Sequence, residues 1–365
     1  MDEPVIPVPA VQPQARYRVI QWATGSVGRT ALRRIIDHPD LELAGLYVYD
    51  PRKVGRDAGE IAKRPTTGVR ATDRIEEILA LDADVVLHTS RISVPYVDQN
   101  AEVERLLASG KNVISVNGFY MPEVHGEAYA GPLREAARRG NSTLAGVGLN
   151  PGFIAERIAL ALTGLMARLE RIECFEWVDG SNIPAQGLVF GVMGFGTDPA
   201  TVDITRGPLE QMFTALYSET FAYVAQALGT RVSSLEPDHR LTLAPRDISV
   251  AAGTIRKGTL VATEWCWNVG FADGCVMTHS LLWTADPSLN GDCDGAHWRV
   301  RLKGRPNLEL NFSVEDPDSA APASRAAMDA TAALLVCAIP DVCAAPSGFY
   351  RLPSVATYST RLRTS

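Results

Sequence analysis

The sequence lacks the features that define several large functional classes. It has only six cysteines in 365 residues, and no C-x-x-C pair or paired-histidine spacing, so we expect neither a disulfide scaffold nor a metal site. The proline-rich start has no basic residues before an apolar core, which is typical of a flexible tail rather than a signal peptide. We expect no apolar run of membrane-spanning length. The net charge of −7 argues against nucleic acid or an anionic membrane as the partner.

Motifs for nucleophilic catalysis and for nucleoside triphosphates are also missing. The chain has no G-x-S-x-G elbow and no G-x-x-x-x-G-K loop. Its length suits two domains, and its apolar and charged fractions are those of a globular protein. We expect buried thiols in a reducing, cytoplasmic environment.

What the sequence does contain is a glycine loop between an expected strand and an expected helix. After apolar residues 17–22 the chain reads ATGSVG, a G-x-G-x-x-G pattern whose first glycine is replaced by Ala23. Gly25 lets the main chain approach a pyrophosphate, Gly28 lets the helix pack close to the strand, and the N–H groups of the helix start face the phosphates. We therefore expect NAD or NADP to be held by Thr24, Gly25, Ser26, Val27 and Gly28.

The end of the next expected strand, residues 41–50, carries conflicting signals about the cofactor. Asp50 lies just over twenty residues past Gly28, where a carboxylate accepts a hydrogen bond from the ribose 2′-hydroxyl of NAD. Arg52 and Lys53 follow at once, and cations there hold the extra phosphate of NADP. The choice stays open, and a solvated loop is an equal alternative for the two cations.

Strand and helix patterns alternate as far as residue 150, which predicts a parallel sheet covered on both faces. Ligands gather at the carboxyl ends of such strands. Thr89 and Ser90 follow strand 84–88, and Asn117 follows strand 112–116. Asn150 follows strand 143–147 and is expected to cap a helix over residues 153–166. We expect a tail at residues 1–15, a Rossmann domain at 16–150, and these four residues beside the cofactor.

Beyond residue 170 the periodicity changes from helical to alternating. Residues 261–271 and 275–283 flank a D-G turn and predict a β-hairpin. We expect a mostly antiparallel α+β domain for substrate binding and dimerisation over residues 151–323, interrupted by a helix at 209–228. Its tryptophans belong mostly to the sheet core. Residues 324–365 are expected to form a helix and tail that return to the Rossmann domain.

The chain resembles the dihydrodipicolinate reductase-like oxidoreductases, and more closely the branch with 2,4-diaminopentanoate dehydrogenase and the native amine dehydrogenases. The similar segments are VIQWATGSVGRTALR, HPDLELAGLYVYDPRKVGRDAGE, GKNVISVNG, GVGLNPGF and GFGTDP. The resemblance implies a dimeric, nicotinamide-dependent enzyme whose site lies between two domains. There, hydride passes to an imine or carbonyl carbon.

Two departures from these relatives bear on the substrate. The His-His-x-x-Lys segment and the Ser-Gly-Thr substrate loop of true dihydrodipicolinate reductases are absent. The amine-forming members carry a glutamate just after the strand that here reads KNVISV. This chain has Asn117, Gly118 and Phe119 there, so the carboxylate that would hold ammonia is missing from that position.

Reduction of a carbonyl or imine requires a proton donor beside the reacting atom. The loop after strand 112–116 offers His125 and Tyr120 first, and then Glu123, although each also suits an ordinary surface loop. We expect an NAD(P)-dependent oxidoreductase acting on a C=O or C=N bond of a small, partly apolar substrate. One alternative is an amine dehydrogenase with a relocated carboxylate, for which Glu123 is the obvious substitute. Another is a non-catalytic NAD(P)-binding sensor.

Overall fold

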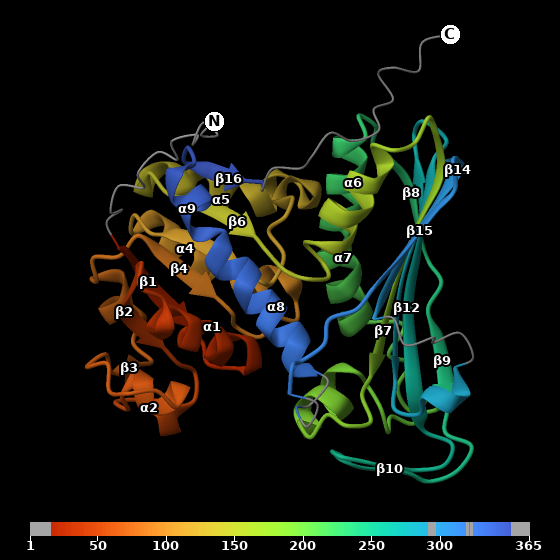
Figure 1. The fold of residues 1–365 in the computed structure, drawn as a ribbon, viewed down its shortest axis with the longest axis horizontal. Helices are drawn as coiled ribbons and strands as arrows, with labels where there is room; N and C mark the ends of the chain where they lie inside the picture. The colour runs from red at the N-terminus through yellow and green to blue at the C-terminus, as the bar shows by residue number, and fades with distance from the viewer. Residues whose placement is uncertain (1–15, 291–296, 319–320, 322–323, 352–365) are drawn as a thin grey trace, which may run out of the picture.

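The computed structural model describes residues 16–290, 297–318, 321 and 324–351. Two large sheets stand side by side, with α6 (Leu160–Thr163) and α7 (Pro208–Ala227) between them (Figure 1). The first sheet is parallel and helix-covered, and the second is mixed and mostly antiparallel. The fold class expected from the sequence is therefore confirmed. The expected tail at residues 1–15 lies outside the described residues.

The first sheet has seven strands in the order β16-β6-β5-β4-β1-β2-β3. From β1 the chain builds outward on one side through β2 and on the other through β4, so the switch point of the topology lies beside β1. Open α/β sheets bind ligands at that point, beyond the carboxyl ends of the strands. The strands are β1 (Tyr17–Trp22), β2 (Leu41–Tyr47), β3 (Ala71–Thr72), β4 (Val85–His88), β5 (Asn112–Ser115), β6 (Thr143–Gly146) and β16 (Gly348–Tyr350).

The helices of this part are amphipathic, and each buries its apolar face against the sheet. In α1 the buried residues Ala31, Leu32 and Ile35 recur at helical spacing, as a surface helix requires. The helices are α1 (Ser26–Asp37), α2 (Ala58–Ala62), α3 (Ile75–Leu79), α4 (Asn100–Ala108) and α5 (Glu127–Gly140), with short turns η1 (Pro51–Lys53), η2 (Tyr96–Gln99) and η3 (Pro122–His125).

The C-terminal segment corrects one expectation from the sequence. Residues 324–344, comprising α8 (Ser324–Cys337) and α9 (Ile339–Ala344), have a mean hydropathy of 1.6 and are long and apolar enough to cross a membrane. The expectation that no such run exists is therefore wrong for this segment. However, α8 packs against α1, and α9 packs against β5 and β6. Leu335, Ile339 and Val342 are buried there, so part of this apolar segment belongs to the core of the first part, although only 28% of its most apolar window is buried.

The second sheet has the order β15-β14-β7-β13-β12-β8, with β9 also paired to β12. Strands β7 and β13 run parallel, and the other neighbours are antiparallel. The expected hairpin is present as β12 and β13, turning at Gly274 with a φ of 89°. The strands are β7 (Arg168–Asp179), β8 (Val232–Pro237), β9 (Arg240–Leu243), β12 (Leu260–Phe271), β13 (Val276–Thr284), β14 (Trp298–Arg305) and β15 (Leu308–Phe312), beside the ribbon of β10 (Ile248–Val250) and β11 (Gly253–Ile255).

The strand register brings one carboxylate onto the buried face of this sheet. Side chains alternate along β7, so Glu176 shares its face with the buried Ile172 and Cys174. In the ladders, Glu176 lies opposite Trp298 of β14 and Leu281 of β13. An acidic side chain thus occupies a position that the strand pattern reserves for apolar residues.

The segment that joins the two parts differs from the expected helix over residues 153–166. A π-helical turn, η4 (Ile154–Ala159), leads into the short α6, and the residue at the helix N-terminus is Phe153. Asn150 does not cap this helix because its side chain donates to Glu176 instead. A second π-helical turn, η5 (Gly187–Val192), follows β7. Such turns are rare and occur frequently at functional sites.

A buried carboxylate on α7 fastens a loop of the first part to the second. Glu219 is completely buried and contacts the Tyr96 hydroxyl at 2.7 Å, the Met121 amide at 3.0 Å and His125 Nε2 at 3.0 Å. The loop turns toward α7 through left-handed residues, Gly118 at a φ of 92° and Phe119 at 65°. Because these donors replace the water that a carboxylate needs, the loop after β5 is held against α7.

We predict that Glu219→Ala lowers the free energy of unfolding by about 3 kcal/mol, because it leaves buried donors without an acceptor. Urea unfolding followed by tryptophan fluorescence measures the change. The matched control is Glu60→Ala, which removes an ion pair with Arg56 whose side chains are 59% and 43% exposed. The control is expected to cost less than about 1 kcal/mol. Equal losses in the two variants would contradict the anchoring role of Glu219.

Candidate functional site

A cleft of about 720 Å³ opens at the switch point of the first sheet, and we call it the switch-point cleft. Its walls come from the segments that follow β1, β2 and β4 and from the start of α4. The lining residues are Ala23, Thr24, Gly25, Tyr49, Asp50, Lys53, Thr89, Ser90, Arg91, Ile92, Ser93, Val94, Asp98, Gln99 and Glu102. The cleft therefore collects six of the residues expected to bind the cofactor, namely Thr24, Gly25, Asp50, Lys53, Thr89 and Ser90.

The glycine loop beside this cleft fits a phosphate group. Gly25 precedes α1 without a side-chain cap, and the first bond of the helix runs from the Arg29 amide to the Gly25 carbonyl. The amides of residues 26–28 consequently have no partner within the helix. A Cβ added at Gly25 would meet nothing within 4 Å, so the space above these amides is open. These observations fit the pyrophosphate of a dinucleotide at the N-terminus of α1.

Gly28 and Ala23 fix the close approach between α1 and β1. A Cβ at Gly28 would lie 2.4 Å from both the Ala23 carbonyl oxygen and Thr89 Oγ1. Ala23 replaces the first glycine of the pattern and has a φ of 70°, in the left-handed region that glycine adopts without strain. The loop thus keeps the backbone path of a dinucleotide-binding turn despite the alanine.

Two of the residues expected to distinguish NAD from NADP, Asp50 and Lys53, line the switch-point cleft, and Arg52 lies between them in the chain. The Asp50 carboxylate accepts hydrogen bonds from the Arg52 amide and guanidinium, which lower its pKa to about 2. The Lys53 ammonium turns back to the glycine loop and donates to Thr24 Oγ1 at 2.8 Å. A ribose hydroxyl can bond to Asp50, and a ribose phosphate can bond to Arg52 and Lys53, so this corner accommodates both cofactors.

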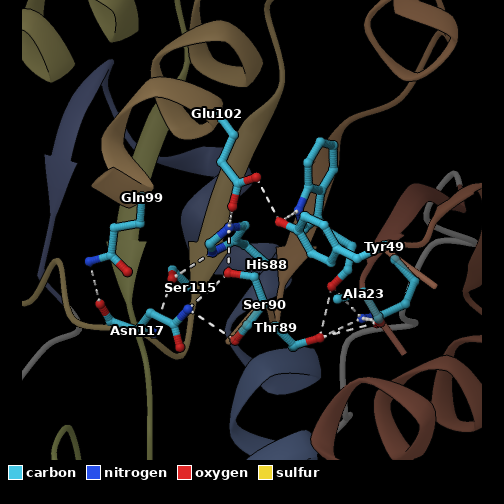
Figure 2. A network of polar contacts seen from close by, with 11 residues as sticks. Ala23, Tyr49, His88, Thr89, Ser90, Gln99, Glu102, Ser115 and Asn117 are labelled. Carbon is cyan, nitrogen blue, oxygen red and sulfur yellow. Dashed lines mark hydrogen bonds and ion pairs between the residues drawn. The ribbon is translucent and has the colours of Figure 1, made fainter. Parts of the chain in front are cut away.

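A hydrogen-bonded network joins the ends of β4 and β5 beneath the cleft (Figure 2). The Asn117 amide donates to the Ser90 carbonyl and hydroxyl, both at 3.0 Å, and the Gln99 amide donates to the Asn117 carbonyl. Thr89 Oγ1 donates to the Trp22 carbonyl at 2.8 Å. The structure therefore brings Thr89, Ser90 and Asn117 together, as the strand-end argument expects.

The same network buries a histidine at the end of β4. His88 is fully buried, with Nδ1 2.9 Å from Ser115 Oγ and Nε2 2.8 Å from Glu102 Oε1. Tyr49 donates to the other oxygen of Glu102 at 2.6 Å (Figure 2). Both ring nitrogens of His88 thus have partners, which makes it a structural support of the cleft.

A second cavity, of about 370 Å³, lies between the two parts of the chain, and we call it the interdomain cavity. Its first wall comes from the start of α1 and the ends of β5 and β6, its second from the second sheet and η5, and its third from α8. The lining residues are Val27, Val116, Gly148, Leu149, Asn150, Pro151, Glu176, Trp177, Val178, Asp179, Ile183, Leu188, Met193, Trp283, His297, Trp298, Ser324, Ala327, Met328 and Thr331. Two of the residues expected to bind the cofactor, Val27 of the glycine loop and Asn150, thus line this cavity and not the switch-point cleft.

Glu176 is the one buried carboxylate among the residues that line the interdomain cavity. It accepts hydrogen bonds from Asn150 Nδ2 at 2.9 Å, from Trp298 Nε1 at 2.8 Å and from Trp283 Nε1 at 3.3 Å. Burial raises the pKa of Glu176, and these donors oppose the rise only in part. A carboxyl group in this state holds its proton more tightly than an exposed one, which suits a group that accepts and returns a proton.

Two other polar groups complete the cavity. Asn150 Oδ1 is buried without a hydrogen-bond partner among the described residues, so Asn150 offers an acceptor beside Glu176. His297 Nδ1 accepts from the Val314 amide at 3.3 Å, and burial lowers the pKa of His297. The ring is therefore neutral near pH 7 with its proton on Nε2.

The three expected proton donors lie elsewhere. His125 bonds to Glu219, the Tyr120 hydroxyl donates to the Pro151 carbonyl at 2.8 Å, and Glu123 pairs with Arg351 at 2.7 Å. None of Tyr120, Glu123 and His125 lines the switch-point cleft or the interdomain cavity. Across the described residues we find no group of three or more His, Cys, Asp or Glu side chains placed to hold a metal ion.

Glu176 is not among the residues expected from the sequence to form the site, although the segment RIECFEWVD contains a signal for it. Alternation from Ile172 through Cys174 places residue 176 on the core-facing side of the strand. A charged residue at such a position is costly unless it is paired or functional. A glutamate at a core-facing position of a strand therefore indicates a candidate site residue.

Comparisons with known proteins agree with the geometry. Residues 19–115 match the family model for the N-terminus of dihydrodipicolinate reductase. A curated amine dehydrogenase from Streptomyces virginiae is 29% identical over 313 residues, which cover 81% of this chain and 85% of the relative. These matches confirm the resemblance drawn from the sequence and the assignment to the oxidoreductases.

Solved structures share the fold over almost the whole chain. The amine dehydrogenase from Mycobacterium smegmatis has a TM-score of 0.74 at 18% identity, covering 92% of this chain and 94% of that chain. GenD2 from gentamicin A biosynthesis, solved in complex with NAD, has a TM-score of 0.51 at 17% identity, covering 93% and 90%. At these identities the likeness establishes the architecture.

We predict that Gly25→Ala weakens cofactor binding, whereas Gly28→Ala lowers the stability of the fold. The methyl group of Gly25→Ala would occupy the open space above the α1 amides, so we expect at least tenfold weaker binding of NADH and NADPH with a melting temperature within about 2 °C of the wild type. Gly28→Ala places its methyl group against backbone and should destabilise the fold by about 1–3 kcal/mol. Calorimetric titration and thermal unfolding measure the two effects. Unchanged affinity in Gly25→Ala would exclude a diphosphate at this loop.

Proposed function

We propose that this NAD(P)-dependent oxidoreductase is an amine dehydrogenase, which converts a small, partly apolar ketone or aldehyde into the amine with ammonia as the nitrogen source. The observation that carries the proposal is Glu176, a buried carboxylate held in the interdomain cavity by donors from both parts of the chain. The resemblance to amine dehydrogenases supports it. Glu176 then supplies the carboxylate that this family otherwise carries at the positions of Asn117 to Phe119.

In such an enzyme, the two cavities would bind different parts of the cofactor and the substrate. The switch-point cleft suits the diphosphate and adenosine of the cofactor, and the interdomain cavity suits the nicotinamide together with the substrate. When bound, the cofactor supplies hydride at its nicotinamide ring. The residues proposed to hold it are Thr24, Gly25, Ser26, Val27, Gly28, Asp50, Arg52, Lys53, Thr89, Ser90, Asn117 and Asn150.

The role proposed for Glu176 is proton transfer. Its carboxylate accepts a proton from ammonium, and the ammonia released attacks the carbonyl carbon to give a carbinolamine. Glu176 then returns that proton to the departing hydroxyl, so that water leaves and the imine carbon is ready to accept hydride. Overall, carbonyl compound, ammonium and NAD(P)H yield amine, water and NAD(P)+. Asn150 Oδ1, which has no hydrogen-bond partner among the described residues, accepts an N–H of the ammonia and orients its lone pair.

The charge and lining of the cavity indicate which substrates fit. Its described walls contain Glu176 and Asp179 but neither lysine nor arginine. Ile183, Leu188 and Met193 provide an apolar surface on the second wall. A negative and apolar cavity attracts ammonium and amines and disfavours carboxylates, so we propose uncharged carbonyl compounds as substrates.

Glu123, the substitute expected from the sequence, is less suitable because it is paired with Arg351 and lines neither cavity. Simple reduction of a carbonyl group without ammonia is the second candidate, and its test is the same panel without ammonium. A non-catalytic sensor would bind the cofactor yet oxidise it with no member of the panel.

We predict that wild-type protein oxidises NADH or NADPH with ketones only when ammonium is present, and that Glu176→Gln lowers kcat/KM by 10²- to 10⁴-fold. Because the pKa of Glu176 is raised and its ionised form takes the proton of ammonium, the wild-type rate at constant ammonium concentration should rise with pH through that pKa. The variant should lack this limb. Absorbance at 340 nm follows the reaction.

The control for this experiment is Glu170→Gln, an exposed glutamate on the same strand. It should retain both the rate and the pH profile. Wild-type rates that do not depend on ammonium, or a Glu176→Gln variant that keeps the full rate, would contradict the proposal. Cofactor affinity should stay within about twofold in both variants, which separates loss of chemistry from loss of binding.

We also propose a cytoplasmic homodimer. In the described residues, α6 and α7 cover one face of the second sheet and no helix covers the other (Figure 1). That outer face carries a shallow groove with charges of both signs, which can pair with themselves across a two-fold axis. The groove residues used in this argument are Glu173, Glu264, Thr278, Ser280 and Arg301. No disulfide joins the five described cysteines, which suits a reducing compartment.

We predict a solution mass of twice 39.4 kDa for the wild type in sedimentation equilibrium. Thr278→Arg should shift the mass toward a single chain, because it adds bulk and charge at the centre of the groove. Ala101→Arg, at an exposed position on α4, serves as the matched control and should stay dimeric. A single-chain mass for the wild type would contradict the dimer.

A further inference from the structure

The turn that carries Asn150 is packed around a side chain from the loop after β5. We call residues 148–152 the Asn150 turn, and four of them line the interdomain cavity. A Cβ added at Gly148 would lie 2.6 Å from the Tyr120 hydroxyl oxygen, and one added at Gly152 would lie 2.7 Å from Tyr120 Cε1. Glycine at these two positions therefore leaves the space that the Tyr120 ring occupies.

The hydroxyl group of Tyr120 is also bonded to the Asn150 turn. Tyr120 is buried, and its hydroxyl donates to the Pro151 carbonyl at 2.8 Å. The hydroxyl of Tyr217 on α7 reaches the Asn150 carbonyl only at 3.5 Å. The bond from Tyr120 is the shorter of these two, and losing it would leave a buried carbonyl without this donor.

The backbone at Tyr120 is fixed by neighbouring elements. The amide of the next residue, Met121, donates to the buried Glu219 of α7 at 3.0 Å. On the other side, a Cβ added at Gly146 of β6 would lie 2.6 Å from the Tyr120 amide nitrogen. With α7 and β6 holding its backbone, the Tyr120 ring is a rigid support for the turn.

What the turn presents to the second sheet is one of the donors to Glu176. Asn150 Nδ2 donates to Glu176 at 2.9 Å, and this bond favours the ionised form of the carboxyl group. The other two donors, Trp283 and Trp298, belong to the second sheet itself. The contribution of the first part of the chain therefore depends on the conformation of the Asn150 turn.

We propose that Tyr120 is a positioning residue, whose hydroxyl group holds the Asn150 turn in the conformation in which Asn150 donates to Glu176. The proposal rests on the proposed function, in which Glu176 transfers the proton. It deepens that function by giving a role to a residue that was expected from the sequence to be a proton donor itself.

The test follows the ionisation of Glu176 through the fluorescence of the tryptophans that donate to it. In each background, the pH titration of emission is measured with Glu176 and with Glu176→Gln, and the difference isolates this group. Tyr120→Phe removes only the hydroxyl oxygen. We expect it to raise the midpoint by about 0.5–1 pH unit, because a donor to the ionised form is weakened. At constant ammonium concentration, the rising limb of the rate should move to higher pH by the same amount.

Other titratable groups near Glu176 are common to both members of each pair, so the difference removes them. Tyr217 faces it from α7, and burial followed by the charge of Glu176 raises the pKa of Tyr217 well above its usual range. His297 lines the same cavity with a pKa that burial lowers, and Asp179 lines it as well.

A double-mutant cycle shows whether Tyr120 acts through Asn150. Asn150→Ala removes the donor itself and should raise the midpoint by about 1–2 pH units. Tyr120→Phe added to Asn150→Ala should cause no further shift, because the bond that Tyr120 supports is already gone. Shifts that add in the double variant would overturn the proposal.

Tyr129→Phe is the matched control. Tyr129 is also a buried tyrosine of the first part, but it lies on α5 and lines neither cavity. This variant should keep the wild-type midpoint. A purely structural role of Tyr120 would lower the melting temperature of Tyr120→Phe and leave its midpoint unchanged. That result, or a wild type without any Glu176-dependent transition, would contradict the positioning role.

The fluorescence titration separates this proposal from the proposed function, because it needs neither cofactor nor substrate. A midpoint that rises in Tyr120→Phe only while Asn150 is present supports the positioning role even if no amine forms. Ammonium-dependent turnover with an unmoved midpoint would leave the amine dehydrogenase standing and remove the role of Tyr120.

Discussion

The hydrogen bond between Asn150 and Glu176 is the constraint on which the arrangement of the site depends. A buried carboxylate must find several donors, and the second sheet alone provides two indole groups. The third donor, Asn150 Nδ2, comes from the end of the first sheet at 2.9 Å. Because the carboxylate is satisfied only when the two parts of the chain meet in this way, its burial and the position of the interdomain cavity are linked. Glu219 on α7 is a second buried carboxylate that is satisfied across the same interface, because it accepts hydrogen bonds from the Tyr96 hydroxyl and the Met121 amide of the first part.

The sequence predicts the cofactor side of the molecule because local geometry determines that side. The glycine loop, the strand before it and the helix after it are contiguous, so spacing alone indicates where the free amides of residues 26–28 lie. Strand ends in a parallel sheet meet at one edge, and Ser90 and Asn117 do lie within hydrogen-bonding distance. Strain at Ala23, with its φ of 70°, is the local consequence of placing an alanine where the turn favours glycine.

The site proposed for catalysis was harder to predict from the sequence, because segments that are far apart in the chain form it. The three hydrogen-bond donors to Glu176 are Trp298 on β14, Trp283 on β13 and Asn150 after β6. These residues are far apart in the sequence, so no single segment shows that they meet. The resemblance drawn from the sequence instead favoured the loop after β5, which contains Tyr120, Glu123 and His125. That loop turns away at Phe119 and is held by Glu219, so proximity along the chain did not become proximity to the cavity.

The state of Glu176 follows from two opposing effects on its pKa. Burial penalises the charged form and raises the pKa, whereas three N–H donors favour the charged form and lower it, with burial the larger effect. Relative to an unfolded chain, ionised Glu176 therefore costs stability as pH rises through its folded pKa, because the folded state holds its proton more tightly. A fully exposed carboxylate would be ionised too readily to return a proton, and a buried one without donors would stay protonated and bind no ammonium. For the role proposed for Glu176, the donors supplied across the interface between the two parts offset part of the effect of burial on its pKa.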